Sequence, residues 1–524
     1  ADLLLGAGTM RVRTDPDALA EFATDESGIF QAEEIEAVYY PQSEEELADA
    51  IARANAEGSL ATLSGGGTGI TGGRVAIHGG LVISTQDLRE PRAQDLPRYE
   101  VEQYGKKHAI YVDEAAMEAY VPAGISLEML ATLLPGDLLY PPDPTEKTAF
   151  MGGTIATNAS GARTFNYGPT RDWVVGLRLV LPNGEMMSIG RGEVTAQEGV
   201  LTFQSEAGTE YAVQVPTYRM PEVKNAAGLY AAPDMDLVDL FIGSEGLIGV
   251  VTEVQVRLVH KPESIVGEIA FFAEEEQALG FVDDLRQAAR EGTMQVLAIE
   301  YFDGHCLQFM EHEAVEKTAG AAVYTEIAGT LDDIDPLMEA LEAHESLQDW
   351  FAETEDDRQE QKAFRHSLPE GINSYLRRQG TQKLGTDLVV PAECFREMIE
   401  HYHAAGKAFA EEYPRQGQHY LMFGHIGNYH LHVNFVPHNA DELRCAKGLY
   451  AGLARRAVSV GGTISGEHGV GKKTILMDGE ELPYLEIMYG KAGLLEIARV
   501  KRVLDPNLIL NVGNMVPREY LLEV

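Results

Sequence analysis

Two long glycine-rich segments constrain this chain more than any other feature of its sequence. The first is SGGGTGITGG at residues 64–73, and the second is DPTEKTAFMGGTIATNASGARTFNYG at residues 143–168. Glycine lets the backbone approach a ligand closely and adopt positive φ, so that successive N–H groups can point at one anion. One such cluster alone is as readily a flexible loop. Two clusters with small polar residues between the glycines suit an extended pyrophosphate that is wrapped from both sides without lysine.

A nicotinamide dinucleotide is the first alternative that these glycines raise. The spacing G-x-G-x-x-G occurs from Gly67 to Gly72. Its frame does not match a Rossmann turn, however, and no acidic residue ends a second strand at the usual distance. We therefore reject NAD as the cofactor.

The order of elements indicates more than one domain, because 524 residues are too many for one hydrophobic core. Residues 41–58 predict a helix with Ser43 as N-cap, Glu46 three residues later and Gly58 as the stop. The order helix, strand, glycine-rich loop recurs to about residue 260, which indicates an α+β domain. KPES at 261–264 is interpreted as a linker, and a new domain is expected from residue 262. Residues 89–110 and 190–214 are expected to be surface excursions, and 331–364 to be helical.

The charge of the chain excludes several classes of partner. The formal net charge is −41, so binding to nucleic acid or to an anionic membrane surface is not expected. The spacing of Cys306, Cys394 and Cys445 supports neither an iron–sulfur cluster nor a disulfide framework. No apolar run approaches the length of about 20 residues that a transmembrane helix needs. We expect a cytoplasmic protein with no transmembrane segment, and a homodimer is compatible with the sequence.

Histidines gather in FGHIGNYHLHVNF, where a turn at Gly427-Asn428 leads into a strand. Alternate side chains of a strand share a face, so His430, His432 and Asn434 are expected to point together. The segment GEHG at 466–469 adds Glu467 and His468. A solvated sheet face is the commoner fate of one histidine, but it explains three beside GEHG less well. Two imidazoles, a carboxylate and an open position match catalytic Zn²⁺, and Mn²⁺ or Fe²⁺ accepts the same ligands.

Six stretches together resemble one family. They are SGGGTGITGG, PPDPTEKTAFMGGTIATNASGARTFNYG, FIGSEGLIGVVTEVQVRL, GHIGNYHLHVN, GTISGEHGVG and LDPNLILNVG. In this order they resemble the FAD-dependent 2-hydroxyacid dehydrogenases of the vanillyl-alcohol-oxidase fold. That family includes D-lactate dehydrogenase, D-2-hydroxyglutarate dehydrogenase and the flavin subunit of glycolate oxidase.

The resemblance implies a fold and a division of the chain. The fold class would be α+β, with a two-subdomain FAD-binding domain of the PCMH/VAO type at residues 1–261. An α+β cap domain with an antiparallel sheet and the metal site would span 262–480. The C-terminal segment 481–524 would return to the FAD domain.

The resemblance also implies which residues bind FAD. The pyrophosphate would lie on Gly66, Gly67, Thr68 and Gly69. The isoalloxazine and ribityl would lie on Pro142, Asp143, Gly152, Gly153, Thr154, Asn158, Ser160, Gly161, Tyr167 and Gly168, and the pocket would be completed by Ile248, Val250 and Asn511. Neither loop contains a histidine, so we expect non-covalent FAD. For Ile248 and Val250, an ordinary core strand is the alternative.

For the reaction itself, the resemblance implies His425, His432 and Glu467 as metal ligands and His468 as the catalytic base. Arg365 would grip the substrate carboxylate, although a surface arginine facing the acidic run 352–360 is the alternative. Asn434 and Lys383 complete the expected catalytic set. Lys383 is a weaker match, because it precedes Asp387 by four residues and the family lysine by two.

This chain departs from the family motif GHxGDGNLHxN at Asn428-Tyr429-His430. His430 could be an extra ligand, and we favour a role as the partner of a ligand. The displaced lysine favours a small monocarboxylate such as D-lactate over hydroxyglutarate-type substrates.

The sequence thus predicts an oxidoreductase that converts a D-2-hydroxy acid, a small anion, to the 2-oxo acid with metal assistance. Electrons would pass to a separate acceptor protein or a quinone. D-2-Hydroxyglutarate and glycolate remain alternative substrates. A zinc hydrolase, a flavin protein that makes alkyl ether lipids and a flavoprotein scaffold are the rival classes.

Overall fold

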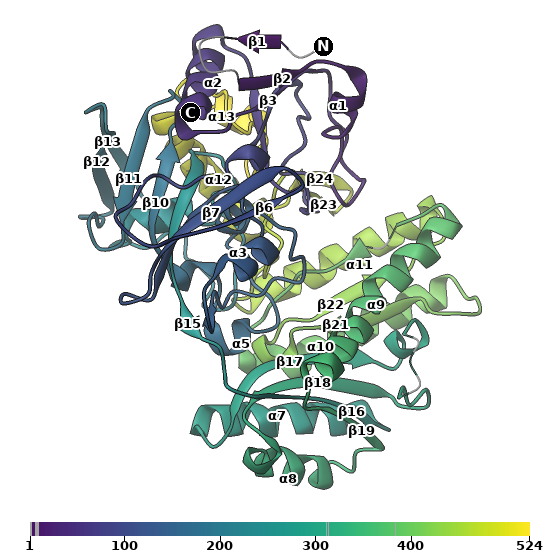
Figure 1. Cartoon of the computed structure of the whole chain (residues 1–524). Helices are drawn as coiled ribbons and strands as arrows, with labels where there is room; N and C mark the ends of the chain where they lie inside the picture. Colours follow the sequence, from purple (N-terminus) through teal and green to yellow (C-terminus); the bar gives the residue numbers. More distant parts are fainter. Residues whose placement is uncertain (1–2, 6–9, 311, 313, 383) are drawn as a thin grey trace.

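The computed structural model describes residues 3–5, 10–310, 312, 314–382 and 384–524. Figure 1 shows two bodies. The upper body contains both chain ends and the sheets formed by the first half of the chain, and the lower body contains one large sheet with its helices. Every helix in the described ranges is too short or too polar to cross a membrane.

The first glycine segment belongs to a five-stranded sheet of order β1-β2-β3-β5-β4. Its strands are β1 (Leu3–Leu5), β2 (Met10–Arg13), β3 (Ile35–Tyr40), β4 (Ala61–Ser64) and β5 (Gly80–Ser84), and its helices are α1 (Pro16–Ala20) and α2 (Glu44–Glu57). The predicted caps of α2 are confirmed, because the Ser43 side chain accepts from the Glu46 N–H and Gly58 ends the helix at positive φ. β4 and β5 pair in parallel, and SGGGTGITGG leaves the end of β4.

The second glycine segment lies beside a six-stranded sheet of order β11-β10-β14-β8-β7-β6. Its strands are β6 (Arg98–Gln103), β7 (Lys106–Asp113), β8 (Glu118–Pro122), β10 (Val174–Val180), β11 (Met186–Gly190) and β14 (Val250–Arg257). The helices of this region are α3 (Leu127–Leu133), α4 (Met151–Thr157), α5 (Thr164–Tyr167) and α6 (Leu237–Phe241). Strands β9 (Leu138–Leu139) and β15 (Val259–His260) pair with each other. The glycines of the second segment lie in and after α4, which contacts β14.

Two segments that we expected to be surface excursions are regular structure. Residues 98–113 form the β6–β7 hairpin at the edge of the six-stranded sheet, and Ile110 and Val112 are fully buried. The other segment contains a separate hairpin, β12 (Val200–Gln204) with β13 (Glu210–Gln214). Its inward side chains Leu201 and Val213 are buried, while its alternate residues are exposed. The β12–β13 hairpin has one polar face, and β6 and the start of β7 are largely exposed, so the composition of both segments resembles that of a loop.

The lower body is built on a seven-stranded sheet of order β19-β16-β18-β17-β21-β22-β20. Its neighbouring strands pair antiparallel, as expected for the cap. The strands are β16 (Ile265–Phe272), β17 (Gln295–Asp303), β18 (Ala321–Ala328), β19 (Gln348–Ala352), β20 (Leu384–Gly385), β21 (Tyr420–Gly424) and β22 (His432–Phe435). The helices are α7 (Glu275–Glu291), α8 (Asp335–Ala343), α9 (Glu355–Gln379), α10 (Phe395–Glu412) and α11 (Ala440–Ser459). β19 interrupts the segment 331–364 that we expected to be helical.

Helices cover both faces of this sheet. On β16, Phe272 packs against Phe281 of α7, with ring centroids 5.2 Å apart. The alternate residues Ile269 and Phe271 belong to a different buried cluster, which contains Phe364 of α9. A strand whose two sides both meet helices is buried on both faces, and β16 is buried from Val266 to Phe272.

The last part of the chain returns to the upper body. It consists of β23 (Thr474–Met477), β24 (Glu480–Pro483), α12 (Glu486–Leu504) and α13 (Arg518–Leu522). Between α12 and α13, Leu510 forms a parallel bridge to Ala61 of β4. The Asn511 side chain accepts from the Leu63 N–H at 2.7 Å. The tail therefore lies beside the strand that opens into the first glycine loop.

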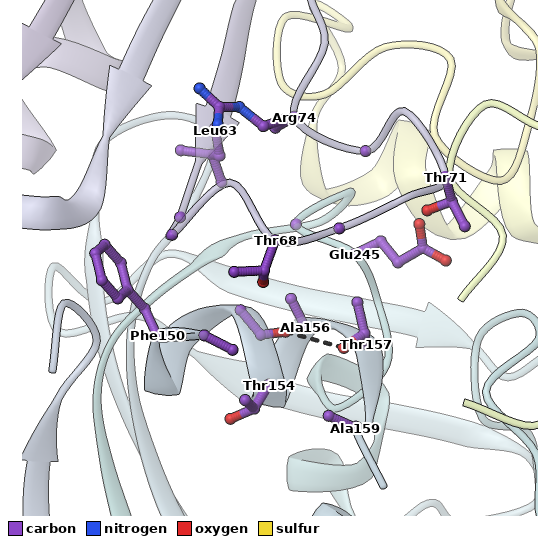
Figure 2. A pocket seen from close by; sticks show the side chains of 18 of the residues that line it. Leu63, Thr68, Thr71, Arg74, Phe150, Thr154, Ala156, Thr157, Ala159 and Glu245 are labelled. Atoms are coloured by element: carbon purple, nitrogen blue, oxygen red, sulfur yellow. Dashed lines mark hydrogen bonds between the residues drawn. The ribbon is translucent and has the colours of Figure 1, made fainter. Parts of the chain in front are cut away.

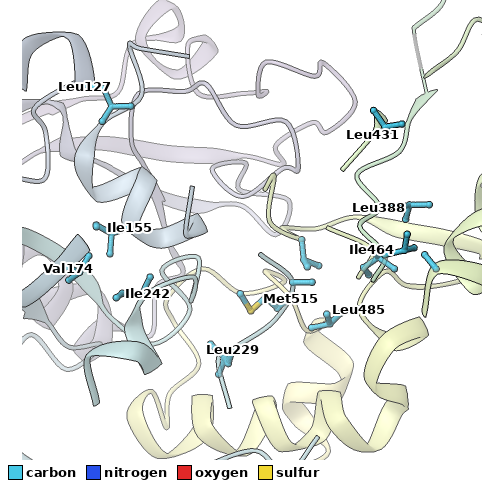
Figure 3. Packing of buried hydrophobic residues seen from close by; sticks show 14 of the residues in the cluster. Leu127, Ile155, Val174, Leu229, Ile242, Leu388, Leu431, Ile464, Leu485 and Met515 are labelled. Carbon is cyan, nitrogen blue, oxygen red and sulfur yellow. The ribbon is translucent and has the colours of Figure 1, made fainter. Parts of the chain in front are cut away.

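One buried apolar cluster runs through both bodies (Figure 3). It includes Ile155 of α4, Met515 of the tail, Leu431 within the histidine segment and Ile464 just before GEHG. Since protein cores are close-packed, this continuity fixes the glycine loops and the histidine segment relative to each other.

Candidate active site

The first glycine loop is held from three directions. The Gly72 N–H donates to the Asp25 carboxylate at 2.7 Å. The Lys472 N–H donates to the Thr71 carbonyl at 2.8 Å, and the Lys472 ammonium donates to the carbonyls of Gly72 and Gly73. Burial lowers the pKa of Lys472 to about 7. These partners fix the loop before any ligand arrives.

Glycine is required at two positions of this loop. Gly67 has φ of +82°, and a Cβ there would lie 2.1 Å from Nη1 of Arg74. A Cβ on Gly66 would lie 3.0 Å from the Thr148 carbonyl oxygen, which belongs to the second glycine segment. The two loops therefore approach each other by backbone, and the backbone itself forms the wall of the space between them.

The second glycine segment is packed as tightly. A Cβ on Gly152 would lie 2.9 Å from Cβ of Ala123, and one on Gly161 would lie 1.9 Å from the Asp143 carbonyl oxygen. Asn158 ends α4 at φ of +49°. These glycines are therefore explained by close packing as well as by any contact with a ligand.

A cavity of about 360 Å³ lies between the two glycine loops (Figure 2). The cavity also reaches Glu467 and His468. Ten of the residues predicted to bind the cofactor line it: Gly66, Gly67, Thr68, Gly69, Gly152, Gly153, Thr154, Ser160, Val250 and Asn511. Seven lie outside its lining: Pro142, Asp143, Asn158, Gly161, Tyr167, Gly168 and Ile248. Ile248 is fully buried in the core, and the part that each residue takes in binding stays a prediction.

Two polar groups of the cavity lining are buried without a partner in the described part of the chain. They are the hydroxyl of Ser160 and Nε of Arg74. An unsatisfied buried donor costs about 1–3 kcal/mol, so both groups favour a ligand that offers acceptors. FAD carries acceptors at its phosphates and on its flavin ring, and the residues present fit it. Arg74 was not among the predicted residues, although it is the first cation after the glycine run.

His425, His432 and Glu467 meet at the edge of this cavity. Oε1 of Glu467 lies 3.3 Å from Nε2 of His425 and 3.3 Å from Nε2 of His432. Tetrahedral Zn²⁺ with bonds of about 2.0–2.1 Å has ligand-to-ligand edges of about 3.3 Å. The two distances from Oε1 of Glu467 to the imidazole nitrogens therefore already match those of a bound divalent ion.

Hydrogen bonds on the far side of each ring orient the two imidazoles. Nδ1 of His425 lies 2.6 Å from Oε1 of Glu300, and Nδ1 of His432 lies 2.9 Å from the Thr386 carbonyl oxygen. Such partners are typical of metal-binding histidines, because they leave Nε2 free to face the ion. Burial alone would lower the pKa of His425, but the charges of Glu300 and Glu467 raise it to about 9. The site thus attracts positive charge.

Lys224 enters the same cluster from the upper body. Its ammonium donates to Oε2 of Glu467 at 2.8 Å and lies 3.1 Å from Nδ1 of His430. Its side chain is only 4% exposed. Burial would raise the pKa of Glu467, but His425 and Lys224 hold it well below its usual value. Nε2 of His425 lies 3.0 Å from Oε2 of Glu467, so the charged carboxylate faces both imidazoles, His425 through both oxygens and His432 through Oε1.

His468 follows Glu467 in the GEHG turn and lines the cavity. Its Nδ1 lies 3.3 Å from Oδ2 of Asp387, and its Nε2 lies 3.5 Å from Oε1 of Glu467. Burial lowers the pKa of His468, against the opposing charges of Asp387 and Glu467. A neutral imidazole whose inner nitrogen faces a carboxylate is suited to accept a proton at the other nitrogen.

Arg365 reaches the cluster through Glu300, and Asn434 contacts His432 directly. Nη1 of Arg365 lies 3.6 Å from Oε2 of Glu300, the carboxylate that also holds His425. Asn434 is buried, and its amide donates to the His432 carbonyl at 3.3 Å. Lys383 lies outside the described residues.

Glu245 ties the GEHG turn to the upper body. Glu245 is the glutamate of GSEG, and it lines the cavity. Its carboxylate accepts from the N–H groups of Val470 and Gly471 at 2.6 Å each. Burial raises its pKa to about 7, although the two N–H groups oppose this shift. The turn that carries the proposed base is thus hydrogen-bonded directly to the cavity wall, and Figure 2 shows Glu245 among the residues of that wall.

Besides Arg74, four residues of this site were missed by sequence reasoning as site residues: Lys224, Glu245, Glu300 and Asp387. Glu245 lies within a stretch that carried the resemblance, so GSEG was a signal for it. Lys224 and Glu300 have no flanking pattern that separates them from other charged residues. Their role follows only from the contacts that the fold makes.

Comparisons with known proteins agree with this geometry. The family model described as "FAD binding domain" matches residues 35–190, and "FAD linked oxidases, C-terminal domain" matches residues 261–515. "Glycolate oxidase subunit GlcD" of Bacillus subtilis is 28% identical over 87% of this chain and 83% of its own length. A "D-lactate dehydrogenase" of Anaerostipes hadrus is 27% identical over 96% of this chain and 94% of its own. A "D-2-hydroxyglutarate dehydrogenase" of Xanthomonas citri is 28% identical over 97% and 94%.

The structure itself is similar to that of an alkyldihydroxyacetonephosphate synthase, with a TM-score of 0.65 and 16% identity. The match covers 97% of this chain and 82% of the other. At this identity the likeness shows the fold alone. It agrees with the two-domain fold that we expected from the sequence.

Proposed function

Because this chain belongs to the FAD-linked oxidoreductase family of D-lactate, D-2-hydroxyglutarate and glycolate dehydrogenases, we propose that it oxidises a D-2-hydroxy acid to the 2-oxo acid. The substrate that we favour is D-lactate. The reaction would be assisted by a divalent ion, with Zn²⁺ as first choice and Mn²⁺ or Fe²⁺ as alternatives. Electrons would leave to a separate acceptor protein or a quinone.

One observation supports this proposal above the others. The cavity that both glycine loops line also contains Glu467 and His468. A flavin held by the loops and an ion held by the histidines would therefore share one space. A zinc hydrolase would need the histidine cluster but would leave the glycine-lined part without a purpose.

The substrate is bound, on this proposal, through its carboxylate. Arg365 adjoins Glu300, which in turn holds His425. A guanidinium matches a carboxylate with two parallel hydrogen bonds. Its side chain is 12% exposed, so this interaction would be shielded from water.

Proton transfer falls to His468. Asp387 faces Nδ1, so Nε2 is the atom that accepts the hydroxyl proton of the substrate. A divalent ion held by His425, His432 and Glu467 would lower the pKa of that hydroxyl. Bound FAD would supply the acceptor for the two electrons and the hydrogen from Cα, as hydride at N5.

The preference for D-lactate rests on the displaced lysine of the sequence KLGTD. A hydroxyglutarate-type substrate needs a cation for its distal carboxylate, and Lys383 is two residues out of the family position. A monocarboxylate needs no such partner.

The test of this function is anaerobic mixing of the purified protein with a panel of D- and L-2-hydroxy acids. The oxidised flavin should bleach with D-lactate and remain yellow with L-lactate. D-2-Hydroxyglutarate and glycolate belong in the same panel. A colourless protein, or a flavin that no member of the panel bleaches, would contradict the proposal.

A further inference from the structure

His430 replaces the asparagine of the family motif, and the function proposed above gives it no task. It is fully buried, with a relative exposure of 0%. Its ring centroid lies 4.5 Å from that of His432 and 5.6 Å from that of His425. By position alone it would therefore qualify as a third imidazole ligand.

Both nitrogens of the His430 ring already have partners. Nε2 lies 2.8 Å from Oδ1 of Asp387, and Nδ1 lies 3.1 Å from the ammonium of Lys224. An ammonium can only donate, so Nδ1 must accept and Nε2 must carry the hydrogen that Asp387 receives. Neither nitrogen has a free lone pair for an ion. Gly466 closes the ring in, because a Cβ there would lie 2.8 Å from Cε1 of His430.

On one side, His430 supports the residue that holds the GEHG turn. The Asp387 carboxylate accepts from the Ser465 hydroxyl at 2.7 Å and from the His468 N–H at 3.0 Å. It also accepts from the Glu467 N–H at 3.3 Å and faces Nδ1 of His468 at 3.3 Å. The direction in which His468 points therefore depends on Asp387.

On the other side, His430 supports Lys224, which holds Oε2 of Glu467. The chain Lys224–His430–Asp387 thus connects the two neighbouring side chains of the turn, one that would bind the ion and one that would take the proton. Lys224 comes from the upper body, and Asp387 and His430 come from the lower body.

We propose that His430 is a positioning residue rather than an ion ligand, and that the Lys224–His430–Asp387 chain sets the orientation of Glu467 and His468 together. This inference rests on the proposed function. Its failure can be separated from failure of that function, because the number of imidazoles on the ion is measured without any turnover.

The first measurement is X-ray absorption on the zinc-loaded, flavin-loaded protein. We expect two imidazole ligands in the wild type and two in His430→Leu. Three imidazoles in the wild type that fall to two in the variant would overturn the proposal. If no hydroxy acid reduces the wild-type flavin, the proposed function fails, and this count still decides the place of His430.

The second measurement dissects the two hydrogen bonds of the ring. The side-chain oxygen of His430→Asn lies near the place of Nδ1 and keeps the bond to Lys224. The side-chain nitrogen of His430→Gln lies near the place of Nε2 and keeps the bond to Asp387. His430→Leu keeps neither. Loss of such an outer partner typically costs about 10- to 100-fold.

We expect the rate of flavin reduction to fall by that factor in His430→Leu and by less in the Asn and Gln variants, at unchanged flavin content and unchanged half-saturating substrate concentration. His403→Leu is the matched control, because His403 also contacts a carboxylate and a second polar group, Glu275 and Tyr420, away from the cluster. Equal rates in the wild type and His430→Asn would show that the lost bond to Asp387 does no positioning. Equal rates in the wild type and His430→Gln would show the same for the lost bond to Lys224. Equal rates in the wild type, His430→Asn and His430→Gln would overturn the Lys224–His430–Asp387 chain, and this comparison does not need His430→Leu to fold.

Discussion

The carboxylate of Glu467 contacts a cation and three imidazoles. Oε2 accepts from Lys224 at 2.8 Å and lies 3.0 Å from Nε2 of His425, and Oε1 lies 3.3, 3.3 and 3.5 Å from Nε2 of His425, His432 and His468. A charged oxygen surrounded in this way is suited to one ion and leaves His468 beside it. Two other residues of the site have separate proposed roles that single substitutions can test: His468 as the base and Arg365 as the partner of the substrate carboxylate.

Replacing His468 with Gln should leave FAD bound and stop its reduction. Glutamine can accept a hydrogen bond but cannot take a proton, so the rate of reduction should fall by about 10²–10⁴-fold. Single-turnover reduction in the absence of oxygen measures this, with flavin content from the absorption spectrum. His401→Gln, on an exposed part of α10, is the control. Wild-type reduction rates in His468→Gln would remove its role as the base.

Replacing Arg365 with Lys should weaken substrate binding. The charge remains, but the two parallel hydrogen bonds of the guanidinium are lost. With charged hydrogen bonds contributing about 1.5–3 kcal/mol, the half-saturating concentration of D-lactate should rise at least tenfold. Arg358→Lys is a matched control on the same helix, because Arg358 bonds to the Ile265 and Glu353 carbonyls instead. An unchanged half-saturating concentration in Arg365→Lys would place the carboxylate elsewhere.

At the scale of elements, a small number of buried ion pairs join segments that are far apart in sequence. Nε of Arg163, at the start of α5, donates to Oε2 of Glu326 on β18 at 2.7 Å. Glu326 is 3% exposed. Burial alone would raise its pKa, but Arg163 and Lys362 outweigh burial and lower it to about 2. This pair ties the second glycine segment to the large sheet.

The Arg163–Glu326 pair should make stability depend on pH in a defined direction. A carboxyl whose pKa is lowered from 4.5 to about 2 on folding stabilises the folded protein above pH 4.5. That stability is lost as the pH falls through about 2. The contribution at neutral pH is about 3 kcal/mol, and about half of it remains near pH 3.

Thermal unfolding of the wild type and Glu326→Gln, measured from pH 7 to pH 3, checks this. The gap between their midpoints should be widest at neutral pH and should narrow toward pH 3. Glu400→Gln, at an exposed carboxylate of α10, is the control. A gap that stays constant with pH would show that the charge of Glu326 contributes nothing.

The sequence alone predicted the parts of this site that short local motifs indicate. The glycine segments, the histidine strand and GEHG were predicted because the spacing of their residues indicates ligand binding. Helix α2 was predicted because its capping residues stand next to it in the sequence. Lys224 was not found, because it lies 243 residues before its partner Glu467. The segments with the β6–β7 and β12–β13 hairpins were predicted only as surface excursions. Their strands were not predicted, because many of their residues are polar and exposed. Contacts of this kind are decided by the tertiary fold alone.

At the scale of the whole molecule, the site exists because the two bodies meet. The glycine loops and Lys224 come from the upper body, and His425, His432 and Asp387 come from the lower one (Figure 1). Glu245 and Lys224 each bond across to the segment 466–472. The central claim is that a flavin in the upper part of this shared cavity is reduced only when an ion occupies the histidine cluster.

The most direct test is the rate at which D-lactate bleaches the flavin in the absence of oxygen, measured before chelation, after exhaustive chelation, and after Zn²⁺ is restored. The account predicts fast bleaching, then a yellow protein that D-lactate does not bleach, and then recovery. Flavin content should be equal in all three samples. Bleaching at the original rate in the protein stripped of metal would contradict the account.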